Sequence, residues 1–146
     1  MKGILADINI QSYVDLLVAR MRSEPWKIFW HHLHLQYFHF SDLGLPLEAL
    51  DSLVWETCQK NQLVLLTDNR NQADPDSLEA TIRSRNTSAC LPIFTIADVP
   101  HLRKSRDYGE KIIDRLFVSL LDIENLRGTR PAFSSLNRSG LLAQLN

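Results

Sequence analysis

The segment Leu63-Val64-Leu65-Leu66-Thr67 constrains the fold of this chain more than any other. It carries no charge and no break in its apolar character, and a polar stretch that begins at Asp68 follows it at once. A short run that is apolar at nearly every position is typical of a strand covered on both faces, as in the middle of a parallel sheet. The sequence therefore predicts a central, fully buried strand.

Three further strands are predicted. Residues 3–6 form a short apolar run that ends at Asp7, and residues 33–40 are rich in aromatic side chains with a period of two. Residues 91–97 form the last run. Because proline cannot donate to a sheet ladder, Pro92 places the start of that strand near Ile93.

Helical patterns separate these strands. Asn9 can cap a helix over residues 10–21, and a second helix is predicted over residues 47–60. Asp74-Pro75 suits the start of a third, since proline fits the first helical position, and residues 107–126 form the longest. Their predicted core positions are Ile10, Val14, Leu17, Val18 and Met21; Leu47, Leu50, Val54 and Cys58; Leu78 and Ile82; and Ile112, Ile113, Leu116, Phe117, Leu120 and Leu121.

Strands that alternate with helices predict an α/β fold, a three-layer α/β/α sandwich around a mainly parallel sheet of about four strands. The length of 146 residues corresponds to one domain. We place that domain at residues 1–126 and regard residues 127–146 as a basic tail that is either packed or loose.

Composition excludes several classes of protein. A hydrophobic content of 45% excludes wholesale disorder, and two cysteines are too few for a disulfide scaffold or a four-cysteine zinc site. No apolar stretch reaches the roughly 18 residues of a membrane span, and Asp7 comes too early for a signal peptide. P-loop, dinucleotide-binding, serine-hydrolase and zinc-protease motifs are absent from the sequence. We expect a soluble, cytoplasmic protein with no membrane partner.

Charge is unevenly distributed along the chain. Residues 1–79 carry 11 acidic residues and 6 Lys or Arg, whereas residues 80–146 carry 6 and 10. Ordinary surface charge explains this distribution, and so does an acidic pocket beside a basic rim. The densest basic segment, residues 101–106, is either a solvated loop or a contact for a phosphate backbone through Arg103, Lys104 and Arg106.

Two aspartates stand where a parallel sheet places its working residues. Asp7 follows the first predicted strand and Asp68 follows the third. Because ligands bind beyond the carboxyl ends of parallel strands, both carboxylates can share one edge of the sheet. Their repulsion is relieved by a divalent cation, and Mg²⁺ or Mn²⁺ prefers oxygen ligands. Solvated strand ends are the alternative.

Four short motifs in order give the chain a resemblance to a known group. Over residues 3–97 it resembles the small PIN-like nucleases, in particular the short PIN-like group found with toxin–antitoxin modules. The motifs are Asp7-Ile8-Asn9, Asp42-Leu43-Gly44-Leu45, Asp51-Ser52-Leu53-Val54-Trp55-Glu56 and Leu63-Val64-Leu65-Leu66-Thr67-Asp68.

The resemblance implies a divalent-metal-dependent ribonuclease, with Mg²⁺ or Mn²⁺ as cofactor and RNA as substrate. Asp7 matches the first metal-binding aspartate of the family. Asp51 matches the acid on the helix after the second strand, although an exposed helix residue is an equal alternative, and Glu56 is a substitute for that role. Asp68 lies in the loop of the third acid. An antitoxin protein and a homodimer are the partners that the resemblance suggests.

The third motif departs from the family pattern. The family places acids two and four residues after the threonine, whereas this chain has Asn69 and Asn71 there. Asp74 and Asp76 are possible substitutes as metal ligands, but both also suit the start of a helix. The departure leaves a second hypothesis open, a catalytically weakened PIN-like protein that binds RNA or protein as a regulatory subunit.

Other candidate groups are weaker. His31, His32, His34 and His39 lie within nine residues but divide between the two faces of a strand, so a solvated set is favoured over a zinc site. Cys58 and Cys90 are interpreted as core residues. The aromatic side chains of Trp26, Phe29 and Trp30 are candidates for a homodimer surface or for the core.

Overall fold

The computed structural model describes residues 1–68, 77–129 and 133–135. Its centre is an all-parallel sheet in the order β2-β1-β3-β4, with a fifth strand, β5, beyond β4. The strands are β1 (Gly3–Ala6), β2 (Gln36–Phe38), β3 (Leu63–Thr67), β4 (Ile93–Thr95) and β5 (Phe133–Ser135). The predicted α/β class and parallel sheet are confirmed. Residues 133–135, in the segment that we had regarded as a tail, add a strand that the sequence did not predict.

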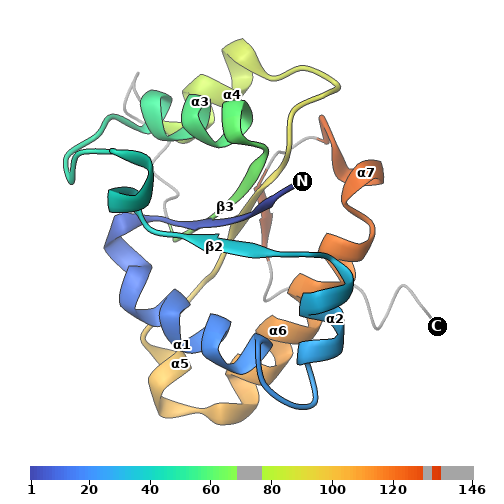
Figure 1. Ribbon diagram of the computed structural model, residues 1–146. Coiled ribbons are helices and arrows are strands. Elements are labelled where there is room, and N and C mark those ends of the chain that lie inside the picture. Colours follow the sequence, from blue (N-terminus) through green and yellow to red (C-terminus); the bar gives the residue numbers. More distant parts are fainter. Residues whose placement is uncertain (69–76, 130–132, 136–146) are drawn as a thin grey trace.

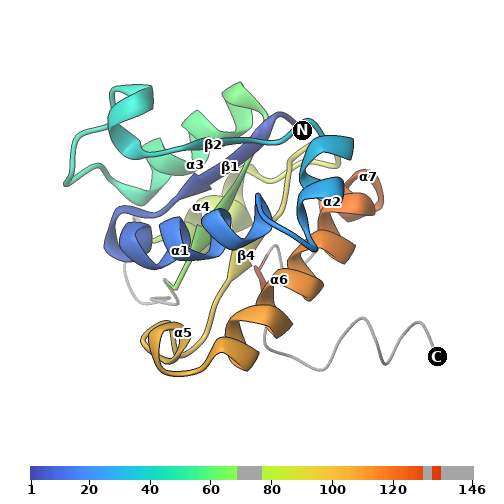
Figure 2. The same ribbon diagram turned by 60° about the horizontal axis from the view of Figure 1, so that its bottom comes forward.

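Helices cover both faces of this sheet. They are α1 (Gln11–Met21), α2 (Lys27–His32), α3 (Asp51–Asn61), α4 (Leu78–Arg85), α5 (His101–Lys104), α6 (Arg106–Leu121) and α7 (Ile123–Leu126), with short 3-10 turns at Ile8–Ile10 and Phe40–Leu43. In Figure 1, α3 and α4 lie above the sheet, whereas α1, α5 and α6 lie below it. Figure 2 brings the lower layer forward and shows α1 alongside α6.

The strand β3 connects the two halves of the core. All five of its residues are buried, as the sequence predicted. Val64 and Leu66 pack into the cluster formed with α1 and α6, while Leu63 and Leu65 pack into the cluster formed with α3 and α4. This alternation follows from the pleat of a strand, which turns successive side chains to opposite faces.

The close pairing of β1 with β2 depends on a glycine. A Cβ atom on Gly3 would lie 1.9 Å from the carbonyl oxygen of Gln36. Any side chain at this position would force the two strands apart, so the apolar run that begins β1 also requires its first residue to be small.

Several helix boundaries differ from the predicted ones. α1 does not begin at an Asn9 cap, because Asp7 instead caps the 3-10 turn that precedes the helix. α3 begins at Asp51 rather than at residue 47, since Leu50 has an extended backbone. As a result Leu47 and Leu50 are 71% and 57% exposed, and their predicted place in the core is wrong.

Other differences are smaller. β2 is shorter than predicted because His34 adopts a left-handed backbone conformation (φ 52°) that interrupts an extended strand. α6 ends at Leu121, which is 48% exposed rather than part of the core. The helix after β3 is capped by the side chain of Ser77. The proposed opening at Asp74-Pro75 lies outside the described residues.

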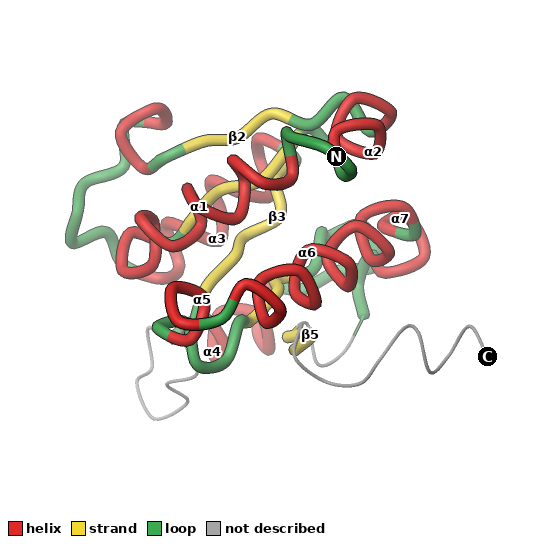
Figure 3. The backbone as a smooth tube through the Cα atoms, turned by 90° about the horizontal axis from the view of Figure 1, so that it is seen from below, coloured by secondary structure: helices red, strands yellow, loops and turns green. Residues whose placement is uncertain are grey.

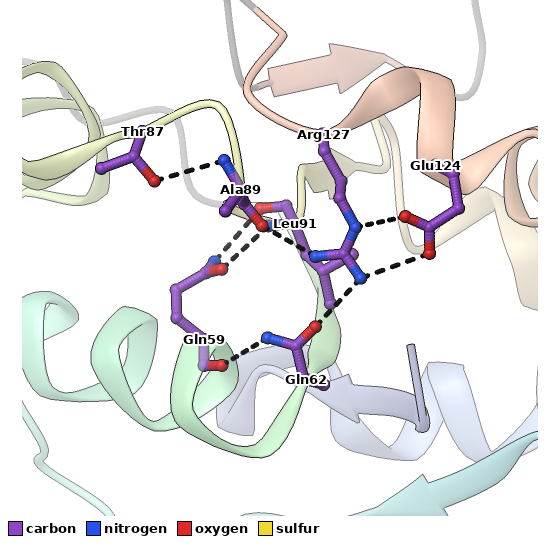
Figure 4. Close-up of polar contacts among 7 residues, drawn as sticks. All are labelled: Gln59, Gln62, Thr87, Ala89, Leu91, Glu124 and Arg127. Atoms are coloured by element: carbon purple, nitrogen blue, oxygen red, sulfur yellow. Dashed lines mark hydrogen bonds and ion pairs between the residues drawn. The ribbon is translucent and has the colours of Figure 1, made fainter.

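A polar network joins distant segments at the edge of the sheet where the strands begin. The Arg127 guanidinium donates to the Ala89 carbonyl (2.7 Å) and to Gln62 Oε1 (3.0 Å), and it pairs with Glu124. Gln59 accepts from the Leu91 amide (2.8 Å) and donates to the Leu91 carbonyl (3.1 Å). Figure 4 shows these contacts, which we call the amino-edge network.

We expect Arg127→Ala to lower the free energy of unfolding by about 2 kcal/mol, because the Ala89 carbonyl and the half-buried Gln62 amide lose a charged donor whose side chain is only 19% exposed. Urea denaturation measures this change. Lys27 is the matched control, since its ion pair with Glu24 is exposed, and Lys27→Ala should cost less than about 1 kcal/mol. Equal losses in the two variants would show that Arg127 is only a surface residue.

Candidate functional site

The order of the strands directs attention to the carboxyl ends of β1 and β3. The chain passes from β1 to β2 on one side of the sheet and then continues to β3 on the other side of β1. In open α/β sheets, ligands commonly bind beyond the carboxyl ends of the strands at the point where the strand order changes direction in this way. Asp7 directly follows β1 and Asp68 directly follows β3, so both predicted residues stand at this switch point.

Asp7 is a buried acid at this position. Its residue is 8% exposed, and one carboxylate oxygen, Oδ2, accepts a hydrogen bond of 2.5 Å from the Thr67 hydroxyl. The other oxygen, Oδ1, accepts from the Asn9 amide at 3.4 Å. The Asp7 amide continues the sheet ladder by donating to the Leu66 carbonyl. The carboxylate is therefore held in place by the ends of both strands.

Asp7 belongs to a row of oxygen-bearing residues across the sheet. Ala6 pairs with Leu66, and Thr67 pairs with Thr95, which places Asp7, Thr67 and Thr95 side by side on consecutive strands. All three lie two residues beyond apolar residues that face α3 and α4, so they lie on that same face. We call these three residues the carboxyl-edge row.

Asp51 approaches the same edge from the helical layer. It is the first residue of α3, whose other end leads directly into the start of β3, so Asp51 lies at the edge where the strands finish. Its charge is near enough to Asp7 to raise the pKa of that acid, and so is the charge of Asp68. The structure thus brings the three sequence-predicted aspartates into one electrostatic neighbourhood.

The pKa of Asp7 is raised above its usual value. Burial is the main cause, because it penalises the charged form, and the charges of Asp68 and Asp51 act in the same direction. The hydrogen bonds from Thr67 and Asn9 oppose this shift. Asp7 also acts on its surroundings, since its charge adds to the burial that raises the pKa of Cys58.

The donor set at this edge suits a hard divalent cation. It consists of carboxylates and hydroxyls, and three negative charges share a small region. Within residues 1–68, 77–129 and 133–135, however, no three His, Cys, Asp or Glu side chains are grouped closely enough to hold a metal ion together. These residues therefore suit an ion that keeps most of its bound water and takes only one or two carboxylate ligands from the protein, as Mg²⁺ commonly does.

The substitute ligands have different outcomes. Glu56 is exposed and lies 3.6 Å from Arg85 in an ion pair on the surface of α3 and α4. Asp74 and Asp76, together with the amides Asn69 and Asn71 of the third motif, lie outside the described residues.

The basic segment is mostly helical rather than a loop: residues 101–104 form α5, Ser105 is extended and Arg106 begins α6. α5 contains Arg103, whose guanidinium lies over the Tyr13 ring at 4.5 Å and donates to the Ser12 hydroxyl at 3.2 Å. Lys104 and Arg106 are exposed. Figure 3 shows α5 beside the beginning of α1, the helix that follows β1 and Asp7 along the chain.

The histidines do not gather into a site in the part of the chain that the structure describes. His39 instead contacts Asp15 at 2.7 Å, and the Tyr37 hydroxyl donates to the same carboxylate oxygen. Cys58 is buried in the core, as predicted, whereas Cys90 is only half-buried.

The aromatic residues proposed for an interface occupy different environments. Trp30 is buried, and Trp26 stacks on Phe117 at 5.8 Å and donates from its indole nitrogen to Glu110. Phe29 is 37% exposed. Larger exposed fractions occur at Leu47 and Leu50, in the segment that precedes α3.

The chain matches no protein-family model, no curated protein and no solved structure. Among the described residues, no helix is both long enough and apolar enough to cross a membrane.

Sequence reasoning missed the hydroxyls of the carboxyl-edge row. Thr67 was noted as part of a motif but not as the partner of Asp7, and Thr95 was not considered. A signal was present, since the apolar runs before Asp7, Thr67 and Thr95 each end at an oxygen-bearing residue. Only the register of the strands shows that these residues are neighbours.

The raised pKa of Asp7 predicts that the metal-free protein loses folding stability as the pH rises. Well below its ordinary pKa of 3.8 the acid is protonated in both the folded and the unfolded state, and folding loses stability as the pH rises through 3.8 and on through the raised folded pKa. Asp7→Asn removes this cost, so its melting temperature should exceed that of the wild type increasingly above pH 3.8 and then reach a constant difference.

Thermal denaturation from pH 3 to pH 8 in the presence of a chelator measures this difference. Glu48→Gln is the control, since Glu48 is exposed, and it should show no such trend. A constant difference at all pH values for Asp7→Asn would mean that the carboxylate carries no penalty for ionisation.

Proposed function

We propose that this protein is a divalent-metal-dependent ribonuclease of PIN-like type, centred on Asp7. The observation that carries the proposal is a buried carboxylate at the topological switch point of a parallel sheet, with two further aspartates in its electrostatic neighbourhood. A buried carboxylate without an opposite charge beside it is destabilising in its ionised form, and groups with such perturbed pKa values are common at functional sites. The resemblance of the sequence motifs to PIN-like nucleases supports the same function.

The aspartates have distinct roles in this proposal. Asp7 and Asp68 hold a Mg²⁺ or Mn²⁺ ion, with Asp51 as the third acid. When bound, the ion activates water and neutralises charge on the scissile phosphate. The hydrogen bond from Thr67 fixes the orientation of the Asp7 carboxylate, so the carboxylate is already oriented before the ion binds.

The exposed cations of α5 and its C-terminal neighbour bind the substrate. Lys104 and Arg106 are free to follow a phosphate backbone, whereas Arg103 is already oriented by Tyr13 and Ser12. Contacts of this kind are electrostatic and independent of base sequence. They suit single-stranded RNA better than a small-molecule substrate.

A second function is favoured by a specific observation. In the described part of the chain no three acids or histidines are grouped as metal ligands, and Asn69 and Asn71 stand where the resembling family has acids. Amide oxygens carry no net charge and replace a carboxylate only partly. A regulatory PIN-like subunit that binds RNA or protein without cleaving it is therefore the alternative.

Cleavage of an unstructured RNA by the wild type and by Asp7→Ala separates these functions. We expect weak cleavage by the wild type in Mg²⁺ or Mn²⁺, none with chelator, and a loss of about 100-fold or more in Asp7→Ala, the size typical for removal of a group that stabilises the transition state. Glu48→Ala, which removes an exposed acid, should cleave as the wild type does.

Equal cleavage by wild type and Asp7→Ala would indicate a contaminating nuclease and would contradict the enzyme proposal. No cleavage by either protein would favour the regulatory subunit. Circular dichroism of Asp7→Ala verifies that the variant is folded.

RNA binding by Lys104 of α5 and Arg106 of α6 is tested separately in the presence of chelator. Because each phosphate contact releases counterions, the double variant Lys104→Ala/Arg106→Ala should bind more weakly and should reduce the slope of log Kd against log salt by about 1 to 1.5. Filter binding at several salt concentrations measures the slope. Lys27→Ala, on α2, is the control, and an unchanged slope in the double variant would remove Lys104 and Arg106 from the binding surface.

The partners implied by the resemblance belong to the same proposal. A small antitoxin-like gene next to this reading frame would support the role of toxin in a toxin–antitoxin pair. Light scattering tests the homodimer, and a monomer at high protein concentration would exclude it.

A further inference from the structure

Thr95 has a buried hydroxyl that forms no hydrogen bond with any described residue. The residue ends β4 and is 1% exposed, and its Oγ1 atom has no hydrogen-bond partner in the described part of the chain. Buried polar groups are nearly always bonded, because an unpaired one loses its water without compensation. A valine would fill the same space without leaving a buried hydroxyl unpaired, so packing alone does not explain why this position has a threonine.

The other buried hydroxyls near this edge have partners. Thr67 donates to Asp7, and Ser77 accepts from the Ala80 amide at the start of α4. In the described residues, the only other buried side-chain atom without a partner is Gln11 Oε1. Gln11 is the first residue of α1, just beyond β1. Both unpaired atoms therefore belong to segments at the carboxyl edge of the sheet.

The register of the sheet relates Thr95 to the proposed site. Thr95 pairs directly with Thr67, and Thr67 contacts Asp7, so the three residues form consecutive members of the carboxyl-edge row. Paired residues on parallel strands turn their side chains to the same face. The unpaired hydroxyl thus lies on the side of the sheet to which the Asp7 carboxylate also belongs.

We propose that the Thr95 hydroxyl is a ligand-binding group of the same site, which hydrogen-bonds a water molecule in the hydration shell of the divalent cation held near Asp7. The inference rests on the proposed function, since it needs a cation at Asp7. Because Thr95 is 1% exposed, a water molecule reaches its hydroxyl only where neighbouring side chains shift to admit it, and a larger partner is excluded. A dication that keeps most of its water needs such outer contacts to hold it in one orientation.

The chain provides a clear set of variants for the test. Thr95→Val keeps the shape and removes the hydroxyl, whereas Thr95→Ser keeps the hydroxyl. Ser119→Ala is the matched control, because Ser119 is also buried but belongs to α6 on the opposite face. For each protein, Mn²⁺ affinity is measured by electron paramagnetic resonance, and the melting temperature is measured with chelator.

We expect Thr95→Val to bind Mn²⁺ roughly 10-fold to 100-fold more weakly, the usual effect of removing an outer-sphere partner. Its melting temperature without metal should equal or exceed that of the wild type, because an unpaired buried hydroxyl has been removed. Thr95→Ser should retain most of the affinity, and Ser119→Ala should leave it unchanged.

Three results would overturn the inference. Unchanged Mn²⁺ affinity in Thr95→Val, with normal binding by the wild type, would remove Thr95 from the site but leave the proposed function standing. A lower melting temperature in Thr95→Val without metal would show that the hydroxyl has a structural partner. Absence of Mn²⁺ binding by the wild type itself would overturn the metal-dependent function and this inference together.

Discussion

Burial of β3 on both faces is the constraint on which the rest of the structure depends. A strand can be apolar at every position only if two layers of helices cover it, and here α1 and α6 supply one layer and α3 and α4 the other. Each layer in turn requires its own stripe of apolar residues. The whole arrangement therefore follows from the need to keep one short segment away from water.

The same constraint creates the candidate site. Apolar strands can end only where the chain becomes polar, and in this sheet three of them end in the same row. Asp7 is 8% exposed where β1 ends, and this burial penalises the charged form of its carboxyl group. In the function proposed above, a bound cation would offset this penalty on the charged form of Asp7, so that stability and ligand binding would be coupled at a single carboxylate.

The elements predicted with the best agreement are those whose pattern reflects burial directly. β1 and β3 were predicted to the residue, because unbroken apolar runs have clear ends. The start of α3 was missed, since Leu47 and Leu50 match a helical stripe in sequence although their backbone does not continue the helix. The spacing of apolar residues along a helical face does not show at which residue the helix begins.

The residues of the candidate site also differ in how far the sequence could predict them. Asp7 and Asp68 could be placed at one edge because strand ends are visible in the sequence, and Asp51 could be named only through the resemblance. The pairing of Thr67 with Thr95 depends on strand register, and the contacts of Arg127 join segments more than 30 residues apart. Neither the strand pairing nor these long-range contacts produce a local pattern in the sequence from which they could be predicted.

The amino-edge network and the carboxyl-edge row lie at opposite ends of the same strands. The polar contacts that fasten the layers therefore do not share residues with the groups proposed to bind a ligand. Substitutions of the acids at the carboxyl edge therefore leave the polar contacts of the amino-edge network in place, so the ligand chemistry at one end of the strands can change while the layers stay joined at the other.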